Sequence, residues 1–258
     1  MSVYLLPIAY TLFVWWFSTG VILYLNGLPK RTHPWTMGFA TLLLGLALLG
    51  LWATRDDTRI TGAYLAFSCA VLVWAWQEIA FLLGYVTGPR RTACPAGSTG
   101  WRRAGYALQT LLHHELALIV LGLVVVTLTW GGANPTGLAC FMIFWVMRQS
   151  AKLNVFLGVR NCGEGFLPNH LKYLQTYFRR APMNSLFPVS VVASSWFAVL
   201  VWQAAAAHGV NGFDATALTF SGTLLSLAIL EHWFMVLPLP SQALWNWGLR
   251  SRAIEPPA

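Results

Sequence analysis

Eight ionisable side chains interrupt segments of the sequence that are otherwise apolar enough to cross a membrane. They are Glu78, His113, His114, Glu115, Arg148, Lys152, Glu231 and His232. A charged group near the middle of a membrane span costs about 2.5–3.5 kcal/mol even on the mildest scale, so five isolated charges would cost on the order of 10 kcal/mol. We therefore expect these groups to interact with one another or with a ligand.

The first arrangement that suits these residue types is a neutral network of ion pairs. Arg148 and Lys152 are four residues apart and share one helix face, so they can offset two of the three carboxylates. The histidines would then donate or accept hydrogen bonds. Such a network needs no ligand, because membrane proteins bury paired charges that fix helix packing.

A metal site is the second arrangement, and a tetrapyrrole site is the third. Carboxylates and imidazoles are the ligands of zinc and of carboxylate-bridged di-iron or di-manganese centres, although the spacing differs from the Glu-x-x-His of soluble di-iron bundles. Alternatively, one neutral histidine, His114 or His232, would be the axial ligand of a tetrapyrrole. The candidate metal ligands are Glu78, His114, Glu115, Glu231 and His232.

Helical geometry limits which of these neighbours can act together. Adjacent residues differ by about 100° around a helix, so His114 and Glu115 can border one cavity, and so can Glu231 and His232. His113 lies about 200° from Glu115, so both cannot easily face that cavity. His114 is therefore the predicted inward histidine, and His113 is predicted to be structural.

The elements that position these groups are predicted to be transmembrane helices. Of 258 residues, 57% are hydrophobic and only 9% charged, whereas soluble domains carry about a quarter charged residues. The apolar runs are continuous, and backbone groups in lipid must be satisfied within their own segment, so the fold class is all-α. Seven spans of suitable length are predicted: 3–25, 36–53, 60–86, 105–130, 135–157, 186–208 and 213–237. They form one domain, residues 1–258, a polytopic helical bundle.

The distribution of basic residues predicts the orientation of this bundle. Arginine and lysine are concentrated in every second loop, around residues 30–31, 90–103 and 160–180. By the positive-inside rule these loops are cytoplasmic, so the N-terminus lies outside and the C-terminus inside. The net charge of +8 then reflects topology and attraction to anionic headgroups, and no nucleic-acid partner is expected.

This orientation brings the polar groups of four spans to a common depth. Glu78 lies about eight residues before the cytoplasmic end of its span, Glu115 about ten after the start, and Glu231 about six before the end. All of these positions fall in the cytoplasmic half, which predicts a single site inside the bundle. The segment "KLNVFLGVRN" adds Asn154 and Arg160 at its cytoplasmic mouth, where they could receive a headgroup or a carboxylate, although helix capping explains part of the pattern.

The long loop between the fifth and sixth spans predicts a further helix. In "FLPNHLKYLQTYFRRAP", Leu167, Leu171, Leu174 and Phe178 recur at helical spacing with polar residues between them. This pattern predicts an amphipathic α-helix of three to four turns, about residues 166–181, lying on the cytoplasmic leaflet. The four cysteines are far apart, and neither a disulfide framework nor a thiolate metal site is indicated.

Several long strings of the sequence carry a family resemblance. "FVWWFSTGVILYLNGLPKRT", "NVFLGVRN", "FLPNHLKYLQTYFRRAPMNSLFPVS" and "LEHWFMVLPLP" together resemble the PuhE family, photosynthetic complex assembly proteins encoded beside reaction-centre genes in anoxygenic phototrophic bacteria. The resemblance implies a multi-pass protein of the bacterial inner (intracytoplasmic) membrane. It implies a role in assembling the reaction-centre and core antenna complex, or in supplying bacteriochlorophyll to it. It defines no catalytic motif.

Taken together, residues and resemblance predict an assembly factor with a buried Glu/His cluster, balanced by Arg148 and Lys152. The expected partners are membrane lipids, reaction-centre or core antenna subunits, and pigment-biosynthesis proteins. The alternative is a membrane metalloenzyme, of di-iron or zinc type, that acts on a lipophilic substrate such as a pigment precursor or a quinone. Whether the chain is an enzyme is left open, and so is the identity of any transition metal or tetrapyrrole cofactor.

Overall fold

The computed structural model describes residues 2–254 of the chain, and the regular elements among these residues are helices. They contain no β-strand, only an isolated parallel bridge between Val159 and Arg180. The predicted domain, 1–258, includes Met1 and residues 255–258, which lie outside this description. The α-helices are α1 (Ser2–Asn26), α2 (His33–Thr54), α3 (Ile60–Leu82), α4 (Gly100–Thr129), α5 (Thr136–Leu157), α6 (Leu186–Ala205), α7 (Gly212–Val236) and α8 (Asn246–Leu249). The 3-10 helices are η1 (Lys30–Thr32), η2 (Glu164–Phe166), η3 (Asn169–Tyr177), η4 (Ser241–Trp245) and η5 (Arg250–Ile254).

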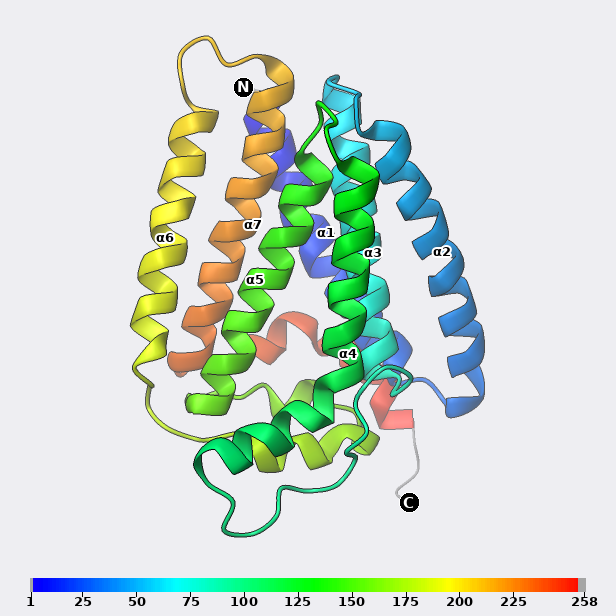
Figure 1. Cartoon of the computed structure of the whole chain (residues 1–258), viewed down its shortest axis with the longest axis vertical. Helices are drawn as coiled ribbons and strands as arrows, with labels where there is room; N and C mark the ends of the chain where they lie inside the picture. The colour runs from blue at the N-terminus through cyan, green and yellow to red at the C-terminus, as the bar shows by residue number, and fades with distance from the viewer. Residues whose placement is uncertain (1, 255–258) are drawn as a thin grey trace.

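The long helices run alternately down and up in one bundle (Figure 1). We call the end formed by residues 27–32, 83–99 and 158–185 the base, and the end formed by residues 55–59, 130–135 and 206–211 the far end. Within the described part of the chain, six helices are long and apolar enough to cross a membrane. The prediction of an all-helical protein with several such helices is confirmed, whereas the seven-span count and the orientation stay predictions.

Helix α5 falls in the predicted fifth span but is not one of those six. Its last three turns carry Arg148, Gln149, Lys152 and Asn154, which lower the apolar character of the segment. It nevertheless packs against the central helices α3 and α7. The helix that is least suited to lipid is therefore held inside the bundle by its neighbours.

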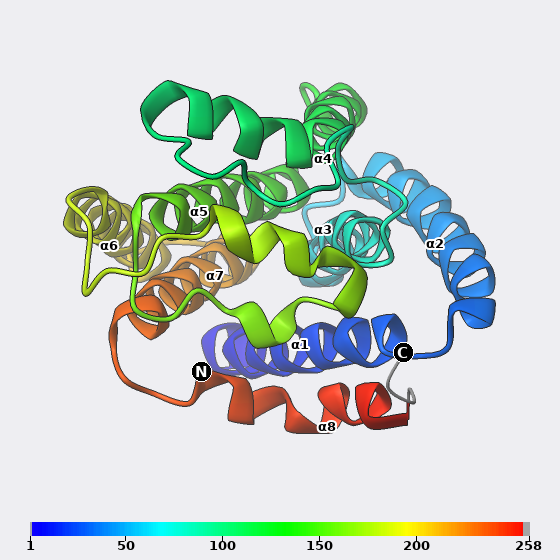
Figure 2. The ribbon, with the colours of Figure 1, turned by 90° about the horizontal axis from the view of Figure 1, so that it is seen from below.

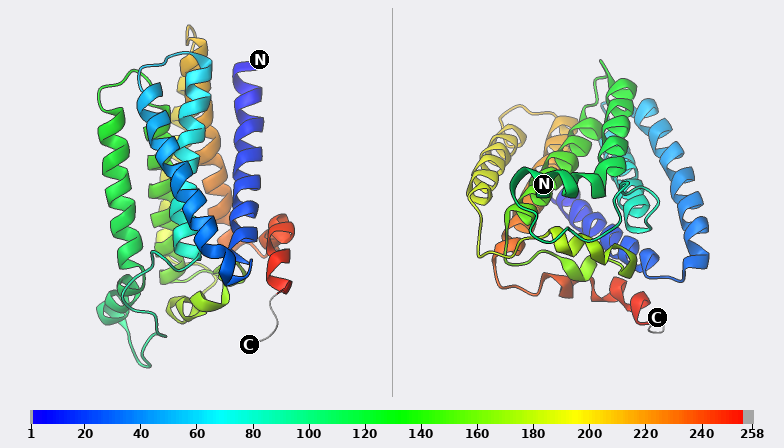
Figure 3. Two further views of the ribbon diagram at one scale, coloured as in Figure 1. Left: turned by 90° about the vertical axis from the view of Figure 1, so that its right-hand side faces the viewer. Right: turned by 60° about the horizontal axis from the view of Figure 1, so that its bottom comes forward.

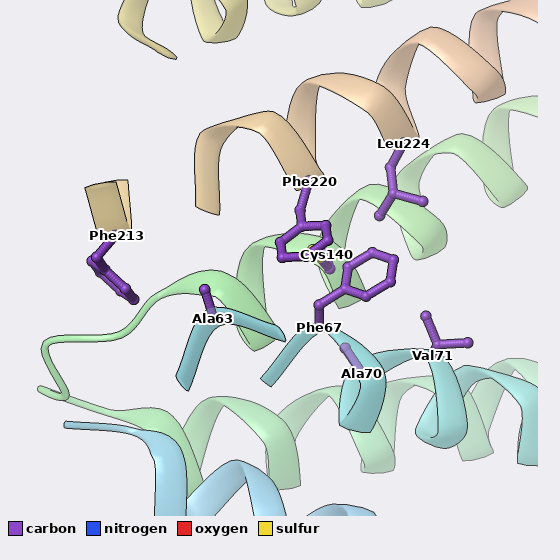
Figure 4. Packing of buried hydrophobic residues seen from close by; sticks show 8 residues of the cluster. All are labelled: Ala63, Phe67, Ala70, Val71, Cys140, Phe213, Phe220 and Leu224. Atoms are coloured by element: carbon purple, nitrogen blue, oxygen red, sulfur yellow. The ribbon is translucent and has the colours of Figure 1, made fainter. Parts of the chain in front are cut away.

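Helices α3 and α7 form the centre of the bundle. In their most apolar windows, 50% and 67% of the residues are buried, against 17–28% in the other four apolar helices. Phe67 of α3 stacks on Phe220 of α7, with 4.3 Å between ring centroids, and Cys140 of α5 lies beside them (Figure 4). Because all three are fully buried, close packing of their side chains holds the far-end half together.

Helix α4 bends where it meets the base. Its first turns run across the base, and the rest follows the bundle axis (Figures 1 and 2). At the bend the His114 N–H donates to the carbonyl of Thr87 over 2.9 Å, and the Arg90 N–H donates to the carbonyl of Gln109 over 3.3 Å. A loop backbone thus inserts into the helical hydrogen-bond ladder, which is a known cause of kinks. The predicted span, beginning at 105, included turns that lie across the base.

Glycine at position 88 permits this insertion. A Cβ atom there would lie 2.1 Å from the carbonyl oxygen of Gln109 and 2.5 Å from the carbonyl carbon of Thr110. Only a residue without a side chain allows the two backbones to approach so closely.

The amphipathic α-helix predicted for residues 166–181 is shorter than expected and of a different type. The segment forms the 3-10 helix η3, Asn169–Tyr177, in which Leu171, Leu174 and Tyr177 are buried. Positions three apart share an edge of a 3-10 helix, so this spacing suits the observed form. Leu171 and Leu174 pack on Phe81 and Leu82 at the end of α3, so η3 closes the base of the bundle.

The two ends of the bundle differ in charge. At the far end, Arg55 pairs with Asp56 and Arg59 with Asp57, and hydrogen bonds from Arg59 lower the pKa of the Asp57 carboxyl to about 2. At the base, Glu164 pairs with Arg180. The exposed cations of the base outnumber this acid: Lys30, Arg31, Arg91, Arg102, Arg160, Lys172, Arg179, Arg180 and Arg250.

The segment that follows α7 returns along α1 (Figure 3). The Trp16 indole N–H donates to the carbonyl of Leu244, and the Trp245 indole N–H donates to the carbonyl of Trp16, both over 2.9 Å. Further along, the Arg252 guanidinium donates to Asn26 Oδ1 on α1 and to the carbonyls of Gly165 and Phe166. Residues 241–252 therefore tie α1 to the loop that closes the base.

Candidate functional site

The polar groups of α5 face the interior of the bundle. Arg148 lies about 140–160° around the helix from Val146 and Leu153, two exposed apolar residues of α5. Its guanidinium donates to Glu78 Oε2 of α3 over 2.9 Å. Trp74 and Phe144, each one turn earlier on the same helices, stack with 5.5 Å between ring centroids. The aromatic stack places the ion pair one turn below it.

One turn further along α5, Lys152 pairs with Glu115 of α4. The ammonium Nζ lies 2.6 Å from Glu115 Oε1, and the Gln149 amide donates to Glu115 Oε2 over 2.5 Å. Side-chain exposure is only 21% for Lys152 and 19% for Glu115. A carboxylate that accepts from an ammonium and an amide has its charge offset, so this pair joins α4 to α5 without a ligand.

Glu231 of α7 is held differently, because no cation among residues 2–254 pairs with it. Its Oε1 accepts from the Trp15 indole N–H of α1 over 2.7 Å. The Trp15 ring meets Trp245 edge to face, with 5.1 Å between centroids. Arg148 is already paired with Glu78, and Lys152 is paired with Glu115. Among the described residues well inside the long helices there are thus three carboxylates and two cations.

His232 connects α7 to α5. Its Nδ1 lies 2.8 Å from the carbonyl of Ala228, and its Nε2 lies 2.8 Å from Ser150 Oγ. A carbonyl oxygen can only accept, so Nδ1 carries a proton, and in the neutral ring Nε2 accepts from the serine hydroxyl. Both ring nitrogens therefore have partners, and the imidazole offers no lone pair to a metal or a tetrapyrrole without losing the Ser150 bond.

His114, the predicted inward histidine, is buried at the bend of α4, whereas His113 is exposed. The His114 ring packs on Phe81 of α3 with 4.8 Å between centroids, and its Nδ1 has no hydrogen-bond partner. With 2% exposure, the ring has no room beside it for a planar macrocycle. Its position between the loop and α3 indicates a structural role at the bend.

The five candidate metal ligands do not converge. Within residues 2–254, no group of three or more His, Cys, Asp or Glu side chains is arranged to hold a metal ion. Instead, Glu78 and Glu115 pair with separate cations of α5, Glu231 accepts from an indole, and the two histidines face different helices. The arrangement corresponds to a network that joins α1, α3, α4, α5 and α7, and the metal hypothesis gains no support from it.

The two residues predicted at the cytoplasmic mouth have separate surroundings. Asn154 is fully buried: its amide donates to the carbonyl of Ser150 and to Ser190 Oγ, and its Oδ1 accepts from the Asn184 amide. It therefore joins α5 to α6 and is not open to a ligand. Arg160 is exposed at the base.

Sequence analysis missed three residues of the network and one buried polar residue beside it. Trp15, Gln149 and Ser150 contact Glu231, Glu115 and His232 respectively. Gln77, beside Glu78, is fully buried, and neither atom of its amide has a partner. Gln149 and Ser150 lie between Arg148 and Lys152, so the polar run "RQSAK" was an available signal, whereas nothing distinguished Trp15 from the other tryptophans.

Comparison with known proteins gives the chain a family. The family described as "Protein of unknown function (DUF3623)" matches residues 1–255. A Rhodobacter capsulatus protein named "Uncharacterized 30.4 kDa protein in puhA 5'region" is 42% identical over 254 residues, which cover 96% of this chain and 91% of the relative. No solved structure matches the chain. Because the family match spans almost the whole sequence, the chain belongs to the DUF3623 family.

Proposed function

We propose that this protein is an integral membrane factor that supports assembly of the photosynthetic reaction-centre and core antenna complex, or bacteriochlorophyll supply to it. The observation that carries the proposal is the relative's name, which places its gene 5′ of puhA. That position agrees with the location beside reaction-centre genes that the PuhE resemblance implies. The proposed partners are reaction-centre or core antenna subunits and pigment-biosynthesis proteins.

The proposed topology has seven spans in one domain, with the N-terminus outside and the base in the cytoplasm of the bacterial inner (intracytoplasmic) membrane. Two features support it. The base carries the excess of exposed cations, whereas the arginines of the far end are paired with aspartates. In addition, α5 is 22 residues long, which suffices to cross a hydrocarbon core of about 30 Å.

The ion pairs support a scaffold in preference to an enzyme. Each pair joins two helices, and the histidines have structural surroundings. A factor that presents subunits or pigments to a growing complex needs a bundle of fixed shape, and directional polar contacts supply that in lipid. In this proposal the apolar outer faces of α2 and α6, with Phe39, Leu46, Val192 and Phe197 exposed, meet lipid or partner helices.

The test is an in-frame deletion in a phototrophic strain that carries this gene. We expect lower reaction-centre and core antenna absorption in isolated membranes, restored by the wild-type gene. The total bacteriochlorophyll content of the cells distinguishes the two proposed roles. A normal content with less complex indicates a role in assembly, whereas a lower content together with less complex indicates a role in pigment supply. Unchanged amounts of complex in the deletion strain, at several light intensities, would contradict the proposal.

A further inference from the structure

The apolar stack between α3 and α7 gives way to polar groups three turns further along the same faces. Glu78 follows Phe67 by eleven positions, and Glu231 follows Phe220 by eleven positions. Eleven residues are about three helical turns, so each carboxylate lies on the face that carries the stacked ring, roughly 16 Å nearer the base. Both helices run from the far end to the base (Figure 1). Glu78 and Glu231 lie four and five residues before the ends of their helices, so the two carboxylates are at a similar distance from the base.

Arg148 and Glu231 are accessible, although they lie on inward faces of their helices. The Arg148 side chain is 45% exposed on the interior face of α5, and Glu231 is also an exposed residue. Beneath them, η3 closes the base, as the view from below shows (Figure 2). Beside them, Trp245 is 5% exposed and packs on Trp15 and Phe166. Arg148 and Glu231 thus offer accessible polar atoms on inward faces of α5 and α7.

Two opposite charges in this region have unused bonding capacity. Glu231 accepts one hydrogen bond from a neutral indole and has no cation, so a positively charged group would offset it. Arg148 uses one guanidinium N–H on Glu78, and its exposure leaves others open to an anion. The Trp15 indole that donates to Glu231 packs against Trp245, so aromatic rings border this carboxylate on one side.

We propose that this region binds a zwitterionic head that carries a primary ammonium and a phosphate, as in phosphatidylethanolamine. The ammonium donates to Glu231, and the phosphate accepts from Arg148. The depth suits such a head, because Glu78 and Glu231 lie four and five residues before the ends of α3 and α7. That is roughly 6–8 Å along the helix, close to the headgroup region. The binding is independent of the proposed assembly role and requires only the bundle in a membrane.

Lipid binding by the full-length protein in nanodiscs tests the proposal. Native mass spectrometry would count lipids bound to the wild type in phosphatidylethanolamine and in phosphatidylglycerol, which has no ammonium. The decisive variant is Glu231→Gln, which keeps the shape and the indole bond but removes the charge. Its control is Glu164→Gln, which removes a carboxylate at the outer surface of the base. Circular dichroism would verify that both variants are folded.

We expect one retained phosphatidylethanolamine, bound at least about tenfold more weakly by Glu231→Gln and unchanged in Glu164→Gln. Competition by soluble phosphoethanolamine distinguishes two supporting outcomes: displacement indicates a site for the head alone, and no displacement indicates a site that also needs the acyl chains. Equal binding by Glu231→Gln and the wild type, or equal retention of phosphatidylglycerol, overturns the proposal. Since complex assembly is measured separately in cells, failure of one proposal does not entail failure of the other.

Discussion

In the far-end half of the bundle, α3 and α7 meet through the stacked rings of Phe67 and Phe220, whereas in the base half the same faces carry Glu78 and Glu231. The rings are fully buried and need only close packing. The carboxylates each take a partner from a third helix, Arg148 of α5 or Trp15 of α1. In the far-end half α3 and α7 thus touch each other directly. Three turns nearer the base, each of them is joined through its carboxylate to a third helix, α5 or α1.

This difference shows how the bundle combines rigidity with access. Apolar packing fills the space between helices, so the far-end half offers little room between α3 and α7. In the base half the ion pairs offset the charges of the helices, but they do not fill the space around them. The Arg148 side chain, for example, is paired with Glu78 and is still 45% exposed. The helices can therefore be fixed at one end and surround a polar region at the other.

The largest expected effect comes from removing the aromatic stack. Phe220→Ala deletes a side chain with 0% exposure and leaves a cavity against Phe67, so we expect a loss of about 3–5 kcal/mol in the free energy of unfolding. Denaturant titration in mixed micelles, followed by circular dichroism, measures this. The matched control is Phe197→Ala on α6, whose side chain is 61% exposed, with an expected change within about 0.5 kcal/mol. If Phe220→Ala and Phe197→Ala lowered the free energy of unfolding by similar amounts, the stacked rings would not be what holds the far-end half together.

A smaller effect is expected from breaking one ion pair of the base half. Lys152→Met leaves Glu115 with only the Gln149 amide, and the partial burial of the pair predicts a loss of about 2–3 kcal/mol. The double variant Glu115→Gln with Lys152→Met removes both charges and should recover most of that loss. A double-mutant cycle from the four unfolding curves measures the coupling. Additive losses would show that the two charges do not stabilise each other.

The smallest effect concerns the loop that bends α4. Gly88→Ala places a methyl group 2.1 Å from the carbonyl oxygen of Gln109, so the two backbones must move apart, and we expect a loss of about 1–3 kcal/mol in the free energy of unfolding. Hydrogen exchange should accelerate at the His114 amide, which donates to Thr87. The control is Gly105→Ala, whose methyl group meets no atom within 4 Å and should leave this exchange rate unchanged. Slow exchange at His114 in Gly88→Ala would show that the bend does not depend on the close approach.

The helical framework was largely predictable because each long helix is an apolar run of sufficient length. Residues 60–86 were predicted as the third span, and α3 is Ile60–Leu82. The two main errors arise from contacts that the local pattern does not contain. The bend of α4 depends on a loop about 25 residues earlier, and η3 takes a 3-10 form over the ends of other helices. The spacing of apolar residues in the sequence predicts which face of a helix is apolar. It does not predict which loop or helix end from elsewhere in the chain will pack against that helix.

The site was predictable as a set of residues but not as an arrangement. The cost of isolated charges indicates that Arg148 and Lys152 must have acidic partners. It does not indicate which carboxylate meets which cation, because that depends on the axial shift and rotation of packed helices. For the same reason five ligand-type side chains at one depth did not imply a metal site: Glu115 and Glu231 reach different neighbours.

The return of residues 241–252 along α1 has a consequence for biosynthesis. Translation proceeds from α1 towards Trp245 and Arg252, and these contacts join residues that lie 229 and 226 positions apart in the chain. Before Arg252 is made, the side chain of Asn26 and the backbone carbonyls of residues 165–167 lack the guanidinium group that later bonds to all of them. Helix α1 is therefore made well before the segment that holds it, and a nascent chain that stops before residue 241 would lack the contacts that tie α1 to the base.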